Sequence, residues 1–577
     1  MKRALLVLFF AGVAAGCTQG SLSDSSDGEG GSGDPSDGSG GGGDDTTTDG
    51  SGAGNVGTGG SGTGAGGSGT GAGGSTGTGA GGSTGSGGGA SSPVAIDCTH
   101  VGSGVDYQVG PGKTYENIGD VPFESLQAGD TVRIFWRSNP YHEKMMITGV
   151  GTAAQPIRVC GVAGPNGELP VIDGANATTR PQLDFPFTGH QPRGLVIIGH
   201  AHDAPYLEQP AHIVLEALEI RGASPENSFT DKAGSTQQYS DSAAGLFVQR
   251  ADDLTVRGLI VHDNNNGLFI GTGGGGDLSH RVLIEQNYVY GNGSLTDYYE
   301  HNVYNEVSDV VYQYNHFGSP RAGNQGVLGA NIKERSAGVV IRYNWIEDGG
   351  HLIDLVDAQE AQADTVGMAT FHTSHVYGNI MVRNGTQEGS MIHYGGDSGL
   401  YQNYRKGTLY FYQNTLVVRN QNAPDYSAPA VFELSTNDEH LVSMNNIYWS
   451  PIVPGGLTPI AMLGERDGNI SGIATFSSDW MTNGWSPYNQ IPGNDANVVA
   501  QVNGFGSGMG GTNPGFVDAA SGDFTLTSSA PVIGQGTDLA NAMPAQPVTQ
   551  QYVVHQNAKP RPAEAQPTLG AEAAPSN

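Results

Sequence analysis

From about residue 200 onward, short apolar runs alternate with an asparagine that recurs about once every 30 residues. Apolar or aromatic residues follow each of these asparagines, and successive ones lie 28 to 35 residues apart. The set is Asn287, Asn315, Asn344, Asn379, Asn414 and Asn446. Repeats of this length without helical periodicity predict stacked β-structure, with one coil of a parallel β-helix per repeat. We expect each Asn to take a left-handed turn conformation and to stack its amide on the Asn of the next coil.

A second strand follows each turn, and six of these strands align without gaps. Because side chains alternate along a strand, one column of the alignment shares a face. That column is apolar throughout and is expected to line the interior: Phe269, Val303, Ile332, Ile353, Ile392 and Phe432. The neighbouring column is expected to point outward: Ile270, Tyr304, Lys333, Asp354, His393 and Glu433. Coils about 4.8 Å apart would make this column a continuous polar ladder. Arg335 shares the outer face with Lys333, and Glu306 holds the same position one coil earlier.

The first 17 residues differ from the repeat region. Lys2 and Arg3 precede a short apolar run and then small residues ending at Cys17. This pattern is typical of an export signal and is too short to span a bilayer as a helix. The segment Ala14 to Cys17 resembles a bacterial lipobox, although an aliphatic residue such as Leu is usual at the position of Ala14. We expect Cys17 to be lipidated and to anchor the protein at the outer membrane or cell surface, with simple secretion as the alternative.

Residues 18–92 consist mainly of Gly, Ser, Thr and Asp, with repeated "GTGAGGS" units. Such a segment has too little apolar surface to offset the entropy of ordering, so a disordered tether is expected. The tether holds eight acidic and no basic residues, and the whole chain has a formal net charge of −31. This charge disfavours nucleic acid as a partner.

Two cysteines lie early in the region that follows the tether. If Cys17 carries lipid, then Cys98 and Cys160 remain. In an oxidising compartment they are expected to form a disulfide, with two unrelated buried thiols as the alternative.

Residues 93–565 resemble secreted right-handed parallel β-helix proteins associated with polysaccharide degradation. The start, "YQVGPGKTYENIGDVPFESLQAGDTVRIF", is similar to the N-terminal cap and first coils of that class. The segment "NIKERSAGVVIRYNWIEDGGHLIDLVDA" is similar to its middle coils, and "NPGFVDAASGDFTLTSSAPVIGQGT" to its closing coil. The resemblance implies an all-β, right-handed parallel β-helix with an N-terminal cap, acting on a polysaccharide. Residues 566–577 are expected to form a disordered tail.

Signature motifs of better-defined β-helix enzymes are missing. The Asn-Thr-Asp motif of polygalacturonases, the Trp-Ile-Asp-His segment of pectate lyases and the Asp-Pro-His motif of mannuronan epimerases do not occur. The alginate lyase and chondroitinase B group uses an outward Lys and Arg beside a calcium site. Lys333 and Arg335 lie in one strand instead, so the resemblance supplies chemical logic and no residue correspondence. It also implies Ca²⁺ as a cofactor, with Glu306 and Asp354 as candidate ligands.

Cleavage of a uronic-acid polymer by β-elimination needs a neutralised sugar carboxylate, a base and an acid. Arg335 suits the first task, because a guanidinium can hold a carboxylate at two points. Lys333 is the expected base if its neighbours lower its pKa, and His393 is the rival. Tyr304 is the expected acid, or a base if ionised. Asp354 is placed to orient Lys333 or His393.

The expected substrate-binding residues are Arg405, His301, His351 and Glu306. Both histidines have an ordinary alternative, in which they end strands or bond loop carbonyls. Lys333, Asp354 and Glu306 have one as well, as exposed ion pairs between coils.

The leading prediction is therefore an exported lyase that acts, as a monomer, on an anionic polysaccharide. One alternative is a glycoside hydrolase, with Asp354 and either Glu433 or Glu306 as its carboxylate pair. The other is a non-catalytic, adhesin-like glycan-binding protein. The polysaccharide stays open, and residues 451–510 receive no role.

Overall fold

A computed structural model describes residues 95–575, with gaps at 187, 206–207, 273–277, 324–325, 385–388, 420–429, 452–459, 489–495, 541 and 544. The described chain is almost entirely β-structure. Its helical segments are α1 (Gln362–Thr365) and the 3-10 turns η1 (Ile118–Asp120), η2 (Phe123–Ser125), η3 (Thr188–Arg193) and η4 (Tyr401–Asn403). No helix in this part of the chain is long and apolar enough to cross a membrane. The signal segment, Cys17 and the tether of residues 18–92 lie outside the described residues.

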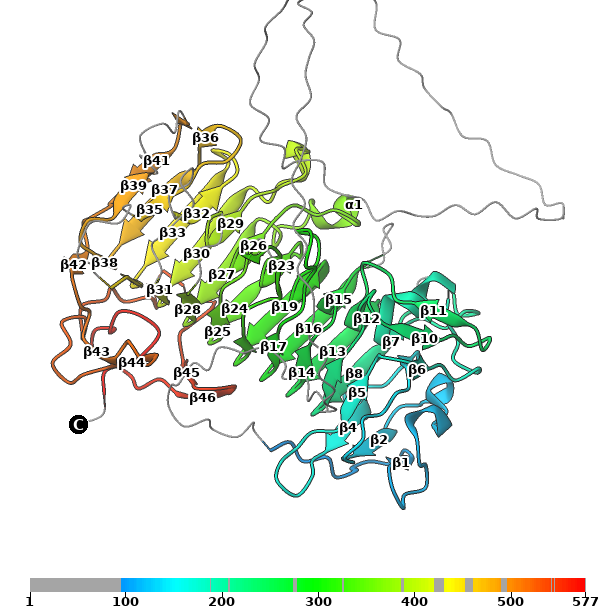
Figure 1. Cartoon of the computed structure of the whole chain (residues 1–577). Coiled ribbons are helices and arrows are strands. Elements are labelled where there is room, and N and C mark those ends of the chain that lie inside the picture. The colour runs from blue at the N-terminus through cyan, green and yellow to red at the C-terminus, as the bar shows by residue number, and fades with distance from the viewer. Residues whose placement is uncertain are drawn as a thin grey trace, which may run out of the picture. The chain divides into compact units, whose positions relative to one another are not determined.

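Three long parallel sheets, here called sheets I, II and III, form the fold (Figure 1). From residue 157 onward, the chain visits them in the order I, II, III in each coil. Sheet I contains β1 (Asp106–Val109), β2 (Thr131–Phe135), β4 (Ile157–Val162), β8 (Ala211–Glu216), β13 (Asp252–Arg257), β16 (Ser279–Glu285), β19 (Val307–Gln313), β24 (Val340–Arg342), β27 (Thr373–Tyr377), β30 (Gly407–Tyr412), β33 (Glu439–Met444), β37 (Ile473–Ser477) and β41 (Gln501–Asn503). Sheet II contains β5 (Val171–Asp173), β9 (Glu219–Arg221), β14 (Ile260–His262), β17 (Tyr288–Tyr290), β20 (His316–Phe317), β25 (Trp345–Glu347), β28 (Ile380–Arg383), β31 (Thr415–Val418), β34 (Ile447–Trp449), β38 (Trp480–Thr482) and β42 (Met509–Gly511). Sheet III contains β3 (Met145–Ile147), β7 (Gly194–Gly199), β12 (Ala244–Gln249), β15 (Asn266–Ile270), β18 (Val303–Asn305), β23 (Ile332–Glu334), β26 (Ile353–Leu355), β29 (Ile392–Tyr394), β32 (Ala430–Leu434), β35 (Ala461–Leu463) and β39 (Ser486–Tyr488).

Short strands lie outside the three sheets. They are β6 (Ala177–Thr178), β10 (Ser228–Thr230), β11 (Thr236–Gln238), β21 (Ala322–Gly323), β22 (Gly326–Val327), β36 (Asn469–Ile470), β40 (Asn497–Val498), β43 (Phe516–Asp518), β44 (Asp523–Leu526), β45 (Gln550–Val553) and β46 (Asn557–Pro560). The three long sheets, each paired in parallel from coil to coil, form the right-handed parallel β-helix, with the crossover hand that twisted strands favour. Ile118, Val121 and Phe123, in and around η1 and η2, join the core near β3 and provide the N-terminal cap.

The inward column of sheet III is confirmed for five of its six residues. Val303, Ile332, Ile353, Ile392 and Phe432 pair in register and are fully buried. They form part of one continuous apolar core.

The alignment of β15 is wrong by one residue. Leu268 pairs with Val303, so Phe269 lies in the outer column beside Tyr304, and Ile270 points inward. The rings of Phe269 and Tyr304 stack at 4.7 Å. Residues 268–270 are all apolar, so alternation could not distinguish the two registers.

The predicted asparagine stack is present inside the turn between sheets I and II. Each Asn amide group donates to the side-chain oxygen of the next coil's Asn, at 2.9 to 3.2 Å. The stack runs through all six predicted asparagines, and Asp479 accepts the last of these bonds at 2.9 Å. The left-handed conformation belongs to the residue before each Asn, such as Tyr343 with φ 54°, rather than to the Asn itself.

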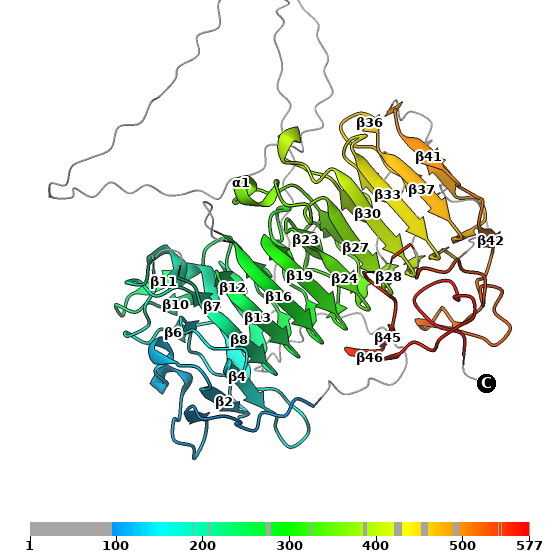
Figure 2. The same ribbon diagram turned by 180° about the vertical axis from the view of Figure 1, so that it is seen from behind.

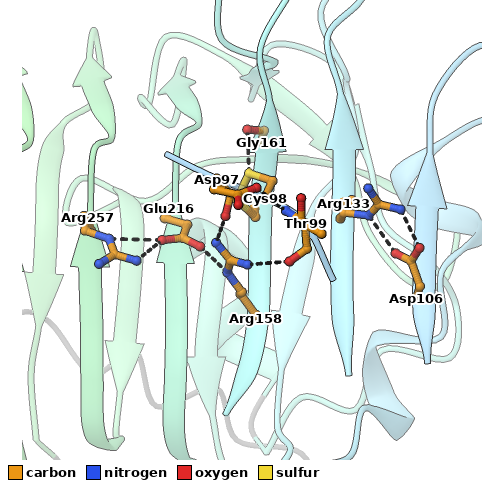
Figure 3. The surroundings of a disulfide bond; sticks show 10 residues. Asp97, Cys98, Thr99, Asp106, Arg133, Arg158, Gly161, Glu216 and Arg257 are labelled. Atoms are coloured by element: carbon orange, nitrogen blue, oxygen red, sulfur yellow. Dashed lines mark hydrogen bonds and ion pairs between the residues drawn. A yellow bond between two sulfur atoms is a disulfide. The ribbon is translucent and has the colours of Figure 1, made fainter. Parts of the chain in front are cut away.

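The predicted disulfide joins Cys98 to Cys160 in β4. It ties the segment that enters the fold to sheet I, as Figure 3 shows. Beside it, the buried carboxylate of Glu216 accepts hydrogen bonds from Arg158 and, at 3.0 Å, from Arg257. Three consecutive coils are thereby linked next to the covalent bond.

The coils end at β41 and β42, earlier than the predicted boundary at residue 565. The segment that resembles a closing coil instead forms the antiparallel pair β43–β44, labelled in Figure 1, and packs on the outer face of sheet II. Figure 2 shows the same orange-to-red part of the chain from behind. Phe516 and Phe524 of that pair join Trp345, Val417 and Trp480 in a second apolar cluster.

The prediction of a disordered tail is wrong for residues 566–575. Leu569 and Ala571 are buried in the same second cluster. Gly570 donates its backbone N–H to the carbonyl of Asn445 at 2.8 Å. The guanidinium of Arg561 also donates to several carbonyls between residues 568 and 572. The side chains of Leu569 and Ala571 supply packing and the backbone of this segment supplies hydrogen bonds, which composition alone does not reveal.

Candidate active site

Five consecutive coils each place one polar side chain in the outer column of sheet III. Tyr304, Lys333, Asp354, His393 and Glu433 pair in register from β18 to β32. The strands are short and rigidly stacked, so these side chains are held at the spacing of neighbouring strands. The predicted ladder is therefore present.

The ladder lies beneath loops and is largely closed to solvent. The side chain of Lys333 is 13% exposed, and those of Asp354 and His393 are 4% and 1% exposed. The covering residues follow β26 and β29, and they include Asp357 and Asp397. The interpretation of Lys333 and Asp354 as an exposed ion pair is therefore wrong, since both side chains are largely buried. A buried charge depends on its partners for stabilisation.

Lys333 and Arg335 hold one carboxylate between them. Lys333 bonds Oδ2 of Asp397 and lies 2.9 Å from Oδ2 of Asp354. Arg335 approaches Oδ1 of Asp397 at 3.4 Å and donates to the backbone oxygen of Asp357 at 2.7 Å. Asp397 therefore bridges the two cations through different oxygens.

Lys333 does not have the lowered pKa that a base would need. Burial opposes its charged form, but Asp354 and Asp397 outweigh burial and raise the pKa of Lys333. Burial likewise opposes the charge on Arg335, and Asp397 and its other partners raise the pKa well above the ordinary value. Both residues are therefore cations that can hold an anion.

His393 is bonded to an acidic group and to a hydroxyl. Its Nδ1 lies 2.8 Å from Oδ1 of Asp354, and its Nε2 lies 2.9 Å from Oγ of Ser435. Burial opposes protonation, but Glu433 and the bond to Asp354 raise the pKa of His393. Glu433 is itself bonded to Arg466 at 3.0 Å.

Tyr304 is a neutral phenol beside a carboxylate. Its hydroxyl donates to Oε1 of Glu360 at 3.1 Å, and the guanidinium of Arg335 lies 5.8 Å from its ring centre. Burial and the charge of Glu360 raise the pKa of Tyr304 well above the ordinary value. The ionised form that direct base catalysis would require is therefore disfavoured.

Two of the residues expected to bind substrate are structural. Arg405 is fully buried, and its guanidinium donates to the backbone oxygens of Ser336 and Glu334 at 2.9 and 2.8 Å. Glu306 is fully buried and accepts three backbone N–H groups from residues 359–361. Each instead fastens a loop to the coil beneath it.

The two remaining histidines differ in exposure. His301 is buried, its Nδ1 accepts the backbone N–H of Ala330 at 2.9 Å, and burial lowers its pKa to about 3. It corresponds to the ordinary alternative of a histidine that bonds loop backbone. His351 is half-buried and lies two residues before β26, and its ring lies 5.5 Å from that of His393. Burial lowers the pKa of His351 as well.

Several residues of the site were missed because they lie in loops between coils. Asp357, Asp397, Glu360 and Arg466 all reach the ladder from segments that do not repeat in length. Asp397 has one usable signal, since it comes four residues after His393 in "HYGGD". A polar residue just past an outward ladder position is a reasonable candidate to fold back over it.

The two residues expected to bind calcium do not fit that ion. Calcium takes six to eight oxygen ligands. The oxygens of Glu306 accept backbone N–H groups, and those of Asp354 face Lys333 and His393. We therefore derive no step through calcium.

No family model matches the chain, and no curated protein matches it. Solved structures do resemble it. An alginate lyase from Paenibacillus sp. strain FPU-7 is 13% identical, with a TM-score of 0.34, over 56% of this chain and 89% of that one. Pectate lyase Pel9A is 12% identical, with a TM-score of 0.39, over 81% and 95%.

A lacto-N-biosidase of family GH136 from Eubacterium ramulus is 12% identical, with a TM-score of 0.36, over 69% of this chain and 67% of that one. Identities and TM-scores this low carry no argument about the activity of this protein. The site has to be interpreted from its own geometry.

Proposed function

We propose that this protein degrades an anionic, uronic-acid-containing polysaccharide by β-elimination. The observation that carries the proposal is the carboxylate of Asp397, which bridges Lys333 and Arg335. The chain itself thus demonstrates how these two cations bind a carboxylate at two points. A uronate in place of Asp397 would have its charge neutralised, which acidifies the C–H bond next to it.

Proton transfer falls to Tyr304 and Glu360. Acidic neighbours raise the pKa of both Lys333 and His393, which disfavours either as the base. As the carbon gives up its proton to the phenol oxygen, the hydroxyl proton of Tyr304 passes to Glu360. The C–H electron pair forms the new double bond, and the bond to the leaving sugar oxygen breaks. Tyr304 then donates a proton to that oxygen, and Glu360 returns a proton to Tyr304, so both residues regain their starting forms.

The hydrolase alternative has less support. A glycosidase needs one carboxyl group whose pKa is raised, so that it can act as an acid. Burial opposes ionisation of Asp354 and Glu433, but Lys333 lowers the pKa of the first and His393 that of the second. Burial raises the pKa of Glu306, but its oxygens are occupied by backbone N–H groups.

Incubation with a panel of uronic-acid polymers tests the proposal. We expect the ultraviolet absorbance of an unsaturated uronic acid to appear with the wild-type protein. Tyr304→Phe should lose turnover by about 100-fold or more, since general acid–base catalysis contributes on that order. Tyr314→Phe, in the turn between β19 and β20, is the matched control and should retain turnover. New reducing ends without that absorbance would indicate a hydrolase, and saturable binding without any product would indicate a binding protein.

We also propose that the protein is exported and anchored through a lipid on Cys17. The disulfide between Cys98 and Cys160 supports an oxidising compartment. Labelling with a radioactive fatty acid should mark the wild type and spare Cys17→Ala. Unlabelled wild-type protein in the culture medium would indicate simple secretion instead. Action as a monomer stays a prediction.

A further inference from the structure

Two histidines and one aspartate meet at the middle of the ladder. His351 lies two residues before β26, Asp354 lies within β26, and His393 lies on the adjacent strand β29. One donor atom from each lies within 4.8 Å of the others. Asp354 and His393 lie on paired strands of sheet III, and His351 lies two residues before one of them, so the stacking of the coils sets their spacing.

Hydrogen bonds fix which nitrogen of His351 carries the lone pair. Its Nδ1 lies 2.7 Å from the carbonyl oxygen of Ser390, which can only accept. The hydroxyl of Ser390 gives its proton to Glu433, so it is not a donor to this ring. Nδ1 therefore carries hydrogen, and Nε2 of His351 keeps the lone pair that a metal ion requires.

The same reasoning orients His393. The hydroxyl of Ser435 accepts the backbone N–H of Gly396 and donates to the carbonyl of Gly396, both at 2.9 Å. With its own proton used, Ser435 accepts from Nε2 of His393 at 2.9 Å. Nδ1 of His393 is then the atom that faces Oδ1 of Asp354, at 2.8 Å.

Asp354 completes the pattern. Its Oδ2 lies 2.9 Å from Lys333, which leaves Oδ1 on the side of the two imidazoles. Each of the three residues thus has its other polar atom bonded to a supporting group: the Ser390 carbonyl, the Ser435 hydroxyl or the Lys333 ammonium. Support of this kind is what orients ligands at metal sites and fixes the tautomer of metal-binding histidines.

We infer that His351, Asp354 and His393 form a site for a divalent first-row transition metal ion, with Zn²⁺ as its representative. Two imidazoles and one carboxylate suit such ions, whereas calcium and magnesium prefer oxygen. With bonds of about 2.1 Å, tetrahedral donors lie about 3.4 Å apart, so a pair at the 4.8 Å limit has to close by about 1.4 Å when the ion binds. In the metal-bound state, the ion would replace the hydrogen that lies between Nδ1 of His393 and Oδ1 of Asp354. Three protein ligands leave an open position, as at catalytic zinc sites.

The inference does not depend on the proposed function, because a metal can bind whether or not the protein cleaves a polysaccharide. The probe is Zn²⁺ added to the chelator-treated full chain and followed by titration calorimetry, with Co²⁺ absorbance as a second readout of ligand type. The wild type should bind one equivalent. His351→Ala should weaken binding by about 100-fold or more, since loss of a supporting residue alone costs about 10- to 100-fold.

The matched control is His440→Ala, which removes an exposed histidine of β33 and should bind as the wild type does. If His351→Ala alters the circular dichroism spectrum, Ser435→Ala replaces it, with an expected loss of about 10- to 100-fold. Binding equal to wild type in a folded His351→Ala variant, or no one-to-one binding by the wild type, overturns the site. Elimination activity without metal binding would leave the proposed function standing, and binding without turnover would leave only the metal site.

Discussion

Lys333 and Asp354 stand opposite each other on β23 and β26, and their side chains form an ion pair of 2.9 Å under the loop that carries Asp397. A buried ion pair is weak evidence for stability, because desolvation opposes it. Ionisable groups whose pKa values are strongly shifted by burial and by charged partners, however, cluster at functional sites. This contrast underlies the proposal that the ladder is an active site.

Removal of Lys333 should be costly to the fold. Lys333→Met leaves Asp354 and Asp397 buried without their shared cation, so we expect a loss of roughly 3 to 5 kcal/mol in the free energy of unfolding. Urea denaturation measures it. Lys406→Met, whose pair with Asp438 is solvent-exposed, is the control and should cost less than about 1 kcal/mol. Equal small losses in both variants would show that the buried pair contributes nothing special.

The asparagine stack should tolerate few replacements. Asn344 donates to Asn379 and accepts from both the backbone and the side chain of Asn315, all in a fully buried turn. Asn344→Ala leaves these groups unpaired, at about 1 to 3 kcal/mol for each buried group that finds no other partner. Thermal unfolding should detect the loss, whereas the exposed Asn497→Ala should change stability by less than about 0.5 kcal/mol. A melting temperature unaffected by Asn344→Ala would mean that water or relaxation replaces the bonds.

The regular parts of this fold could be predicted because they repeat. Residues like Asn344 and Ile332 recur in successive coils, so the sequence reveals both the turn and the inward face. Phe269 was misplaced because its neighbours are equally apolar and give no register signal. Asp397 and Glu360 were missed because the loops that carry them vary from coil to coil. The charge state of Lys333 depends on those same loop residues, so its role could not be assigned before they were located.

Stability should depend on pH through His262. Its Nδ1 lies 2.7 Å from Asp263, and its Nε2 lies 3.2 Å from Glu219. Burial opposes protonation, but these bonds raise the pKa of His262 from 6.5 to about 9. The folded state therefore binds the proton more tightly. The contribution of protonated His262 to the free energy of unfolding is complete below pH 6.5, and it is lost as the pH rises through about 9.

The size of that effect is on the order of 3 kcal/mol, at 1.36 kcal/mol per pKa unit. Urea denaturation between pH 6 and 10 measures it, and other groups titrate in the same range, so the comparison with His262→Gln is decisive. The variant should lack this part of the decline, while His440→Gln should follow the wild type. Parallel curves for wild type and His262→Gln would contradict the assignment.

The stack of asparagines ends in an acid, and this end should be improvable. Asp479 accepts from the backbone and amide of Asn446 at 2.8 and 2.9 Å, and from the hydroxyl of Ser443 at 2.8 Å. Burial outweighs these bonds and raises the pKa of Asp479 from 3.8 to about 7. An acid whose pKa rises on folding favours the folded state when protonated. Asp479 therefore lowers the free energy of unfolding as the pH rises from about 4 to 7, and this loss stays constant at higher pH.

Asp479→Asn keeps an oxygen for Asn446 and removes the charge. We expect the variant to match the wild type near pH 4 and to exceed it at pH 8 by up to about 4 kcal/mol in the free energy of unfolding. The exposed Asp438→Asn is the control and should show no such pH-dependent gain. A variant that is less stable than wild type at pH 8 would show that the carboxylate is ionised and needed there. The stack would then end in a charge for a reason other than packing.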